Sequence, residues 1–407
     1  MRCVTATISD IASVQTGPFG SQLHNKDYVL VGTPIVTVEH LGQRKMTRQN
    51  LPCVSDTDKQ RLSRYVLEYG DLVFSRVGSV DRCSWVSNDE DGWMFSGRCL
   101  RVRSKDPKIV YHKYLYYFFC MESIKEYVRN IAVGATMPSI NTRLLSEVPI
   151  SLPPIEEQQQ IGDSLSVLDD LIEENTKINH HLEQMAQAIF KSWFVYFEPF
   201  GGEMPDDWRE GTLSDLGDVI GGSTPSKAKA EYYTENGFAW ITPKDLSINK
   251  SKFIAHGADD ITELGLRNSS ARLMPRGAVL FSSRAPIGYI AIASGEVCTN
   301  QGFKSIVPKP NVGTAFIYYF LIENLQPIEN MASGSTFKEV SGTTMKGVHA
   351  IVPDEDTLRR FQEECTPIFD MQELLESENR QLAALRDTLL PRLMSGELSV
   401  ADLGEAK

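Results

Sequence analysis

The sequence predicts an α/β (α+β) fold: two similar mixed α/β domains separated by two long helices that form an antiparallel coiled coil. Three observations predict it: an internal repeat of about 200 residues, strand-like and helical segments in each copy, and a heptad pattern at the end of each copy. The repeat implies pseudo-two-fold symmetry. The expected parts are a first domain at 1–150, a central helical spacer at 151–199, a second domain at 200–352 and a C-terminal helical spacer at 353–407.

The repeat rests on four motifs that recur in the same order. The offset between copies falls from 207 to 200 residues along the chain, as small loop deletions in a duplicated unit would produce. The matched segments are Gly70-Asp71-Leu72-Val73-Phe74-Ser75 with Gly277-Ala278-Val279-Leu280-Phe281-Ser282, Tyr116-Tyr117-Phe118 with Tyr318-Tyr319-Phe320, Gly134 with Gly334, and Leu152-Pro153 with Val352-Pro353.

Each copy begins with a globular part that contains both strands and helices. Short β-branched runs at 34–38 and 289–293 are bounded by Gly and Pro and are typical of strands. Segments 112–130 and 314–326 carry clustered aromatic residues at helical spacing, which predicts buried helices.

A heptad pattern follows each globular part. Apolar or Asn residues alternate at spacings of four and three, which is typical of a coiled-coil seam. Asn179 and Asn379 are equivalent, and an Asn in such a seam tends to fix the register at a cost in stability. The positions are Ile161, Leu165, Leu168, Ile172, Asn175, Asn179, Leu182, Ala186, Ile189 and Trp193 in the first run, and Phe361, Cys365, Ile368, Gln372, Leu375, Asn379, Leu382, Leu389 and Leu393 in the second.

Both helices have start signals in the sequence, but the second heptad run contains a proline. Pro153-Pro154-Ile155-Glu156-Glu157 and Pro353-Asp354-Glu355-Asp356 place Pro ahead of the helix and carboxylates in its first turn. Pro367 lies inside the second heptad run, where it removes a backbone donor, so we expect a kink or break near 363–366 and a main helix that starts close to Ile368. A first helix of about 40 residues would be about 60 Å long.

The charge of the chain is unevenly distributed. The net charge is −12, which by itself argues against binding to phosphates. Residues 1–150 carry +4 and residues 200–352 carry −2, whereas the connecting stretches 151–199 and 353–407 carry −7 each. The acidic residues therefore belong to the predicted helices, and the domains remain able to present basic patches to DNA.

Composition also indicates where the protein works. The seven cysteines form no Cys-x-x-Cys pair, which is typical of reduced thiols in the cytosol. The N-terminus has no apolar signal core, and no apolar run approaches the roughly 18–20 residues that span a bilayer. We expect a cytoplasmic protein with no contact to a membrane.

Several motifs resemble those of one known family, the specificity (S) subunit of type I restriction-modification systems (HsdS). The second copy departs from the pattern, because Pro353-Asp354-Glu355-Asp356 lacks the double proline and the Gln. The resembling segments are Gly17-Pro18-Phe19-Gly20-Ser21, similar to the G-x-F-G-S opening; Pro153-Pro154-Ile155-Glu156-Glu157-Gln158, similar to the entry of the central helix; Gly134-Ala135-Thr136-Met137-Pro138-Ser139-Ile140-Asn141, similar to the turn that closes each recognition domain; and Leu389-Leu390-Pro391-Arg392-Leu393-Met394-Ser395-Gly396-Glu397, similar to the C-terminal ending.

The resemblance implies a non-catalytic subunit that confers DNA specificity. In this family each target-recognition domain reads one half of a bipartite, asymmetric double-stranded DNA target. The helices set the spacer and dock two methyltransferase (M) subunits, one per repeat, and two restriction (R) subunits join for cleavage. AdoMet, ATP and magnesium would then belong to M and R, with no cofactor in this chain.

Missing motifs agree with that expectation. The chain has no Gly-Lys dipeptide and hence no Walker A loop. Its one Pro-Pro pair lacks the flanking residues of an amino-methyltransferase motif, and its seven histidines show no metal-ligand spacing. We expect neither a catalytic centre nor a metal site.

Candidate DNA contacts are basic residues in loops or polar stretches. Arg76 and Arg284 follow the two equivalent strands and are either DNA contacts or structural arginines. Groups of basic residues are candidates for phosphate contacts. These are Lys26, Arg44, Lys45 and Arg48 in the first domain and Lys244, Lys250 and Lys252 in the second, with Lys338 as a further candidate.

Two other functions stay open at this point. A coiled-coil scaffold that joins proteins without base-specific DNA recognition would carry the same heptads. An enzyme in its own right would show AdoMet- or ATP-dependent activity from the purified chain, which we do not expect.

Overall fold

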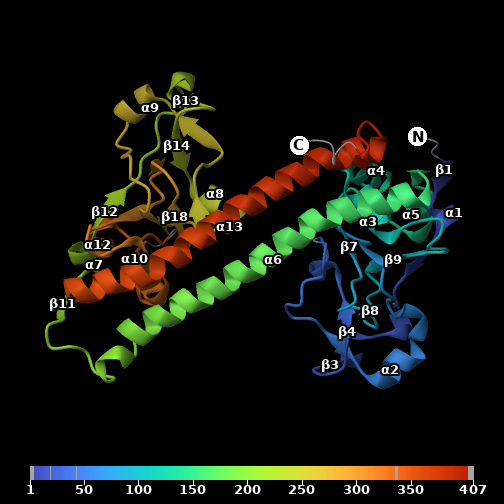
Figure 1. Ribbon diagram of the computed structural model, residues 1–407, viewed down its shortest axis with the longest axis horizontal. Coiled ribbons are helices and arrows are strands. Elements are labelled where there is room, and N and C mark those ends of the chain that lie inside the picture. Colours follow the sequence, from blue (N-terminus) through green and yellow to red (C-terminus); the bar gives the residue numbers. More distant parts are fainter. Residues whose placement is uncertain (1–3, 19, 43, 335–337, 402–407) are drawn as a thin grey trace. The chain divides into compact units, whose positions relative to one another are not determined.

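The computed structural model describes residues 4–18, 20–42, 44–334 and 338–401 (Figure 1). Phe19 of the opening motif lies outside this range. The chain divides into two compact units: Met1–Leu171 with Gln381–Lys407 forms unit 1, and Ile172–Arg380 forms unit 2. Each unit thus combines a globular part with segments of both long helices, and the predicted domain limits at 150, 199 and 352 stay predictions.

The globular part of unit 1 contains two four-stranded sheets and a separate two-stranded pair. β6 is buried at all four residues because it lies between β9 and β7 inside its sheet, as its apolar sequence requires. The sheets run, in order, β2 (Ala12–Thr16), β9 (Cys99–Ser104), β6 (Leu72–Ser75) and β7 (Cys83–Trp85); and β3 (Tyr28–Val29), β5 (Cys53–Val54), β4 (Thr33–Val36) and β8 (Met94–Phe95); β1 (Val4–Thr7) pairs antiparallel with β10 (Pro149–Leu152).

Five short α-helices complete this part of unit 1. The predicted aromatic segment forms two consecutive helices, and the ring side chains of the first are buried against the sheet. That burial explains why a helix so rich in aromatic residues is stable. The helices are α1 (Ile8–Ile11), α2 (Asp56–Arg61), α3 (His112–Cys120), α4 (Glu122–Ile131) and α5 (Thr142–Ser146).

Unit 2 repeats this arrangement, with one more strand in its larger sheet. The sheets run β12 (Gly217–Gly221), β20 (Lys304–Pro308), β17 (Val279–Ser283), β18 (Ile287–Ala293) and β15 (Phe253–Ile254); and β13 (Tyr233–Thr234), β16 (Asp259–Ile261), β14 (Phe238–Ile241) and β19 (Val297–Thr299); β11 (Arg209–Thr212) pairs with β21 (His349–Val352). The helices are α7 (Leu213–Leu216), α8 (Pro243–Ile248), α9 (Glu263–Arg267), α10 (Thr314–Glu323), α11 (Leu325–Asn330) and α12 (Gly342–Lys346).

The repeat extends to small details of capping. Helix α1 begins after Thr7, whose amide donates to Asp10 Oδ2 at 2.7 Å. Helix α7 begins after Thr212, whose amide donates to Asp215 Oδ2 at 2.8 Å. Both helices thus use the same reciprocal cap at an offset of 205 residues. The predicted fold class and internal duplication are confirmed.

Two equivalent glycines are required by a close backbone approach. A Cβ atom on Gly17, in the opening motif, would lie 2.2 Å from the carbonyl oxygen of Ser96. A Cβ atom on Gly222 would lie 2.0 Å from the carbonyl oxygen of Asn300. In each unit this carbonyl lies just beyond the strand that pairs in parallel with β4 or β14. A side chain at either position would push the two backbone segments apart.

The long helices are α6 (Ile155–Phe194) and α13 (Glu355–Ser395). Asp354 caps α13, since its Oδ1 accepts from the amide of Thr357 at 2.9 Å. Within unit 2 the helices run antiparallel, because residue numbers rise along α6 as their partners' numbers fall along α13. The bonds that show it are Asn175 Nδ2 to Glu378 Oε2 at 3.0 Å, Asn179 Nδ2 to Glu376 Oε1 at 3.4 Å and Gln372 Nε2 to Glu183 Oε2 at 3.0 Å.

The prediction of a break near 363–366 was wrong, since α13 continues through Pro367. Pro367 cannot donate to the carbonyl of Glu363, a defect of about 3 kcal/mol in a helix interior. Both residues are exposed, so water can hydrate that carbonyl. Phe361 and Phe369 on the opposite face are buried in the core of unit 2. Burying two such rings contributes roughly 3–6 kcal/mol, which offsets the defect.

Every predicted seam position is buried or half-buried. Ile161 and Leu165 belong to the core of unit 1, whereas Ala186, Phe361 and Cys365 belong to that of unit 2. The two seam asparagines do not bond to each other. Each instead faces a polar group of the opposite helix, Glu376 for Asn179 and Thr176 for Asn379.

We predict that Gly222→Ala destabilises the protein by about 2 kcal/mol, because the new methyl group meets backbone atoms that cannot rotate away. The adjacent Gly221→Ala is the matched control. A Cβ atom there meets nothing within 4 Å and the backbone has no positive φ, so we expect a change below about 1 kcal/mol. Urea unfolding of the full chain measures both, and equal midpoints for the two variants would contradict the close-approach explanation.

Candidate nucleic-acid interface

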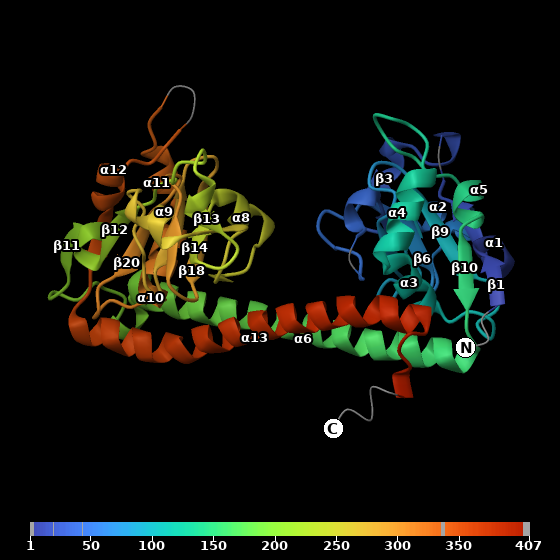
Figure 2. The ribbon, with the colours of Figure 1, turned by 90° about the horizontal axis from the view of Figure 1, so that it is seen from above.

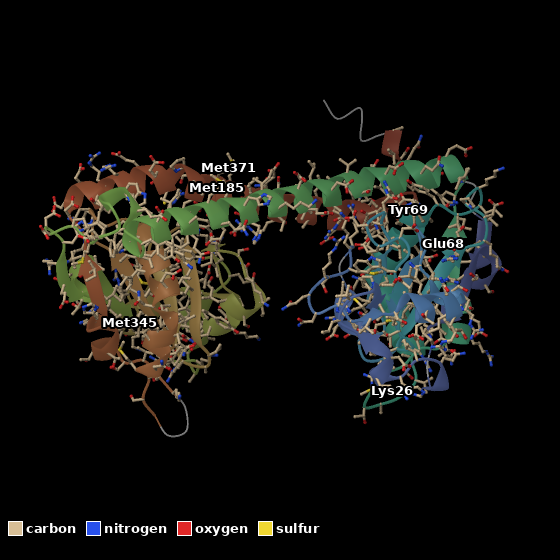
Figure 3. The ribbon with its side chains drawn as sticks, turned by 90° about the horizontal axis from the view of Figure 1, so that it is seen from below. Lys26, Glu68, Tyr69, Met185, Met345 and Met371 are labelled. Atoms are coloured by element: carbon tan, nitrogen blue, oxygen red, sulfur yellow. The ribbon has the colours of Figure 1, made fainter. Side chains whose placement is uncertain are left out.

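The structure separates the ten predicted basic contacts by exposure. Half-buried are Arg44, Lys45, Arg76 and Arg284, and Lys252 is buried. The exposed ones are Lys26, Arg48, Lys244, Lys250 and Lys338. Lys26 lies at the end of unit 1 that is far from its long helices (Figure 3). Exposure lets these side chains meet a phosphate, and among them Arg48 also pairs with Asp89 at 3.3 Å.

Lys252 is enclosed and cannot reach a DNA phosphate. Its side chain is 7% exposed, and Nζ donates to Glu183 Oε2 at 2.7 Å and to Gln372 Oε1 at 2.9 Å. Nζ also lies 3.6 Å from the ring centroid of Phe369. Burial lowers the pKa of Lys252 to about 8, against the opposing effect of the Glu183 carboxylate. The prediction of a phosphate contact was wrong for Lys252, which instead binds the globular part of unit 2 to both helices.

Arg44 has a similar structural role in unit 1. Its guanidinium pairs with Asp170, donates to the carbonyl of Ser166 at 3.2 Å and lies over the ring of Trp85 at 4.9 Å. The side chain is 13% exposed. We therefore correct the prediction for Arg44 from a phosphate contact to a contact between the globular part and α6.

Acidic residues of the long helices also bind other cations and tyrosine hydroxyls of the globular parts. Asp163 accepts from Tyr111 and Lys113, Asp169 accepts from Tyr117 Oη at 2.6 Å, and Glu373 pairs with Arg276. Much of the negative charge that the sequence concentrates in the helices is thus used within each unit. The net charge of the chain consequently says little about the outward faces of the globular parts.

The two predicted strand-end arginines are not equivalent. The amide of Ile140 donates to the carbonyl of Arg76, and the amide of Val340 donates to the carbonyl of Ser283. Arg76 therefore corresponds to Ser283, and Arg284 to Val77. The offset of 207 residues that relates the two strand motifs gives the same correspondence.

Each strand end lies beside a hairpin that recurs in both units. Val133 pairs with Ser139 in unit 1, and Ser333 pairs with Glu339 in unit 2. Figure 2 shows both hairpins, after α4 and after α11, at the end of their unit that is far from the long helices. The predicted closing turn of unit 1, residues 134–141, is thus a protruding element, and its paired residues Val133 and Ser139 differ from Ser333 and Glu339 of unit 2.

In unit 1 the hairpin surface combines cations with exposed apolar side chains. Val133 and Met137 are 63% and 66% exposed. The guanidinium of Arg76 donates to the carbonyl of Gly97 at 3.1 Å, which places it beside the exposed Arg98. Sequence analysis missed Arg98, because only the pairing of β9 with β6 brings it next to Arg76.

In unit 2 the surface beside the corresponding hairpin carries charged side chains. Arg284 and Lys304 flank Glu339, with nitrogen-to-oxygen distances of 3.6 and 3.2 Å. Lys338 lies next to them in the hairpin. The sequence gives no signal for Lys304, since it precedes its partner Glu339 by 35 residues. Three cations against the carboxylates of Glu339 and Glu329 leave a small local positive surplus suited to phosphate.

The described residues contain neither a candidate metal site nor a candidate membrane span. In the described ranges, no three His, Cys, Asp or Glu side chains are grouped as a metal ion would need. None of the helices there combines the length and apolar character needed to cross a bilayer.

Comparison with known proteins identifies relatives over nearly the whole chain. The family model described as the type I restriction modification DNA specificity domain matches residues 3–184 and 205–383. The specificity subunit of the type I restriction enzyme HindI from Haemophilus influenzae is 27% identical over 408 residues, with 83% of this chain and 88% of that protein covered. The MjaIX specificity subunit of Methanocaldococcus jannaschii is 37% identical over 182 residues, which are 44% of this chain and 41% of the relative.

A solved structure shares the fold. The crystal structure of the type I restriction-modification system S subunit from M. genitalium superposes with a TM-score of 0.64 at 16% identity, with 97% of this chain and 96% of that chain covered. At this identity the likeness concerns the fold.

We predict that Lys252→Ala destabilises the protein by about 3 kcal/mol, because it leaves the half-buried Glu183 carboxylate without its cation. Lys250→Ala, two residues away and exposed, should change stability by less than about 0.5 kcal/mol. Thermal unfolding at neutral pH distinguishes the two. If Lys252→Ala unfolds at the same temperature as wild type, the network does not hold unit 2 together.

Proposed function

The chain belongs to the type I restriction-modification DNA specificity family, and from this premise we propose that each of its two globular parts reads one half of a bipartite, asymmetric DNA target. The observation that carries the proposal is the duplicated scaffold with different side chains at equivalent outward positions. Val133 and Ser333 are one such pair, and Ser139 and Glu339 are another. Different side chains at the same place read different bases, which makes the two half-sites unlike each other.

The proposed DNA surface of each unit is the end that carries its hairpin. In unit 1 the cations there are Arg76 and Arg98, and in unit 2 they are Arg284, Lys304 and Lys338. Such cations set the register on the phosphates, while neighbouring polar and apolar groups reach base edges. Exposed Lys26, Arg48, Lys244 and Lys250 are further candidates for phosphate contacts, as is half-buried Lys45.

The chain has the role of a specificity subunit, and we place the chemistry in partner subunits. Members of this family are generally non-catalytic. We propose that two methyltransferase (M) subunits and two restriction (R) subunits supply the activities, together with AdoMet, ATP and magnesium. A coiled-coil scaffold without base-specific recognition is the alternative, and the DNA specificity domain that matches both halves of the chain favours DNA recognition.

We propose that the M subunits dock on exposed apolar side chains of the long helices. Met185 and Met371 of unit 2 are 55% and 45% exposed, and Figure 3 shows them on the helices, away from the strands of that unit. At an offset of 200 residues the equivalents are Leu385 and Leu171, both in unit 1, which are 47% and 45% exposed. The same apolar pair thus recurs once per unit, which fits one M subunit per repeat.

The helices would also determine the spacing of the half-sites. α6 and α13 each contribute residues to both units without a break. A continuous helix advances about 1.5 Å per residue, so its length is a natural ruler for the DNA spacer.

We predict that exchanging residues 1–150 for those of a related specificity subunit changes one half of the recognised target and leaves the other half unchanged. Each half-site depends on the side chains of one unit. The target of the hybrid, assembled with its M and R partners, can be read from the adenine or cytosine methylation it directs. A change in both halves would contradict the assignment of one half-site to each unit.

We predict that Met185→Glu combined with Met371→Glu reduces the number of bound M subunits from two to one, because carboxylates in an apolar contact lose their hydration without a partner. Leu264→Glu on α9, also an exposed apolar position in unit 2 at 49%, should leave two. The mass of the assembled complex gives the answer. Two M subunits on the double variant would exclude this face as the docking site.

A further inference from the structure

Unit 2 has a surface hollow beside its hairpin. The cavity measures about 410 Å³ and lies between the loop after β17, helix α11 and the hairpin residue Lys338. Pro286 and Ile287 form an apolar wall, and Gln326, Glu329 and Asn330 supply polar groups from α11. The antiparallel bridge between Arg284 and Glu339 ties the loop to the base of the hairpin. The hollow therefore opens next to the cations of the proposed DNA surface.

The α11 side of the hollow presents a matched donor and acceptor. Gln326 and Asn330 are both exposed and lie one helical turn apart. Gln326 Nε2 donates to Asn330 Oδ1 at 3.2 Å. This bond orients the two amides and leaves the Gln326 carbonyl as an acceptor and the Asn330 amino group as a donor. A donor beside an acceptor complements N7 and the N6 amino group of adenine in the major groove.

The charges around the hollow favour the same base. Lys338, Arg284 and Lys304 attract the backbone of a nucleic acid and outnumber the carboxylates of Glu339 and Glu329. Glu329 also faces the hollow, and a carboxylate can only accept hydrogen bonds. It can therefore accept from the N6 amino group of adenine, whereas it repels the O6 acceptor that guanine presents in its place.

We propose that this hollow is a base-reading subsite of unit 2 that takes the edge of an adenine, with Gln326 and Asn330 as its readers and Glu329 as the group that excludes guanine. The inference rests on the proposed DNA-reading function and goes beyond it by naming the base and the residues. Pro286 and Ile287 supply the apolar surface that the base edge covers, and Lys338 neutralises the adjacent phosphate.

Unit 1 differs at the equivalent place. Counted back from the paired hairpin residues Ser333 and Val133, Glu329 corresponds to Arg129. Arg129 is bound to Asp81 and Glu122, both at 2.6 Å. By the same count Gln326 corresponds to the exposed Glu126, so unit 1 lacks both the Gln–Asn pair and a carboxylate at the position of Glu329. The adenine preference should therefore be confined to the half-site read by unit 2.

The test uses the full chain assembled with its M subunits and the duplex that the wild-type complex methylates. Each base pair is substituted in turn, and affinity is measured by competition. In Gln326→Ala combined with Asn330→Ala, discrimination at one A·T pair of one half-site should fall on the order of ten-fold, with the other half unchanged. Asn236→Ala, an exposed amide elsewhere in unit 2, should behave as wild type.

A second variant tests the proposed exclusion of guanine. Glu329→Gln keeps the size of the side chain and adds a donor, so affinity for the duplex with guanine at that position should rise relative to wild type. Unchanged discrimination at every position in both variants would overturn the subsite, as would a loss located at a position that holds no adenine. If the wild-type complex itself prefers no sequence, the proposed function fails, a result distinct from failure of the subsite alone.

Discussion

Each globular part of the chain completes its core with side chains from both long helices, and the rest of the structure depends on this packing. In unit 1 the core that contains α3 also contains Ile161 and Leu165 of α6 and Leu390 and Leu393 of α13. In unit 2 the core around α10 takes in residues of the opposite ends of the same helices. The helices are thus structural parts of both units. This burial keeps α13 helical through Pro367, and it leaves the hairpin ends of the units free for recognition.

Much of this organisation could be predicted from the sequence because it has a short-range or periodic signal. The duplicated motifs, the heptads and the aromatic helices all follow from spacing, whereas the main helix expected to begin near Ile368 begins at Glu355. Contacts between residues that are far apart in the sequence leave no such signal. Lys250 and Lys252 look alike in sequence, yet only Lys250 is exposed, because the packing of β15 against the helices encloses Lys252. The contact of Arg44 with α6 leaves no signal in the sequence either, so the sequence predicts a phosphate contact there. The sequence also gives no sign of Arg98 and Lys304, because strand pairing alone brings them to the hairpins.

These contacts explain why the acidic residues are concentrated in the long helices. An acidic chain that binds DNA is unexpected, since phosphate contacts require cations. Here the acidic residues of the helices accept from Lys113, Arg276 and Lys252 on the inward sides of the units. The outward hairpin ends retain basic residues. Within each unit, the contacts that stabilise the core and the proposed recognition surface therefore lie on different faces.

We propose that two unlike readers on one chain define the DNA target. The direct test is mapping of methylated bases in genomic DNA from cells with and without this chain and its partners. We expect one methylated sequence with two different specified segments, separated by a fixed number of unspecified base pairs. A continuous or palindromic sequence, or methylation that does not depend on the chain, would contradict it.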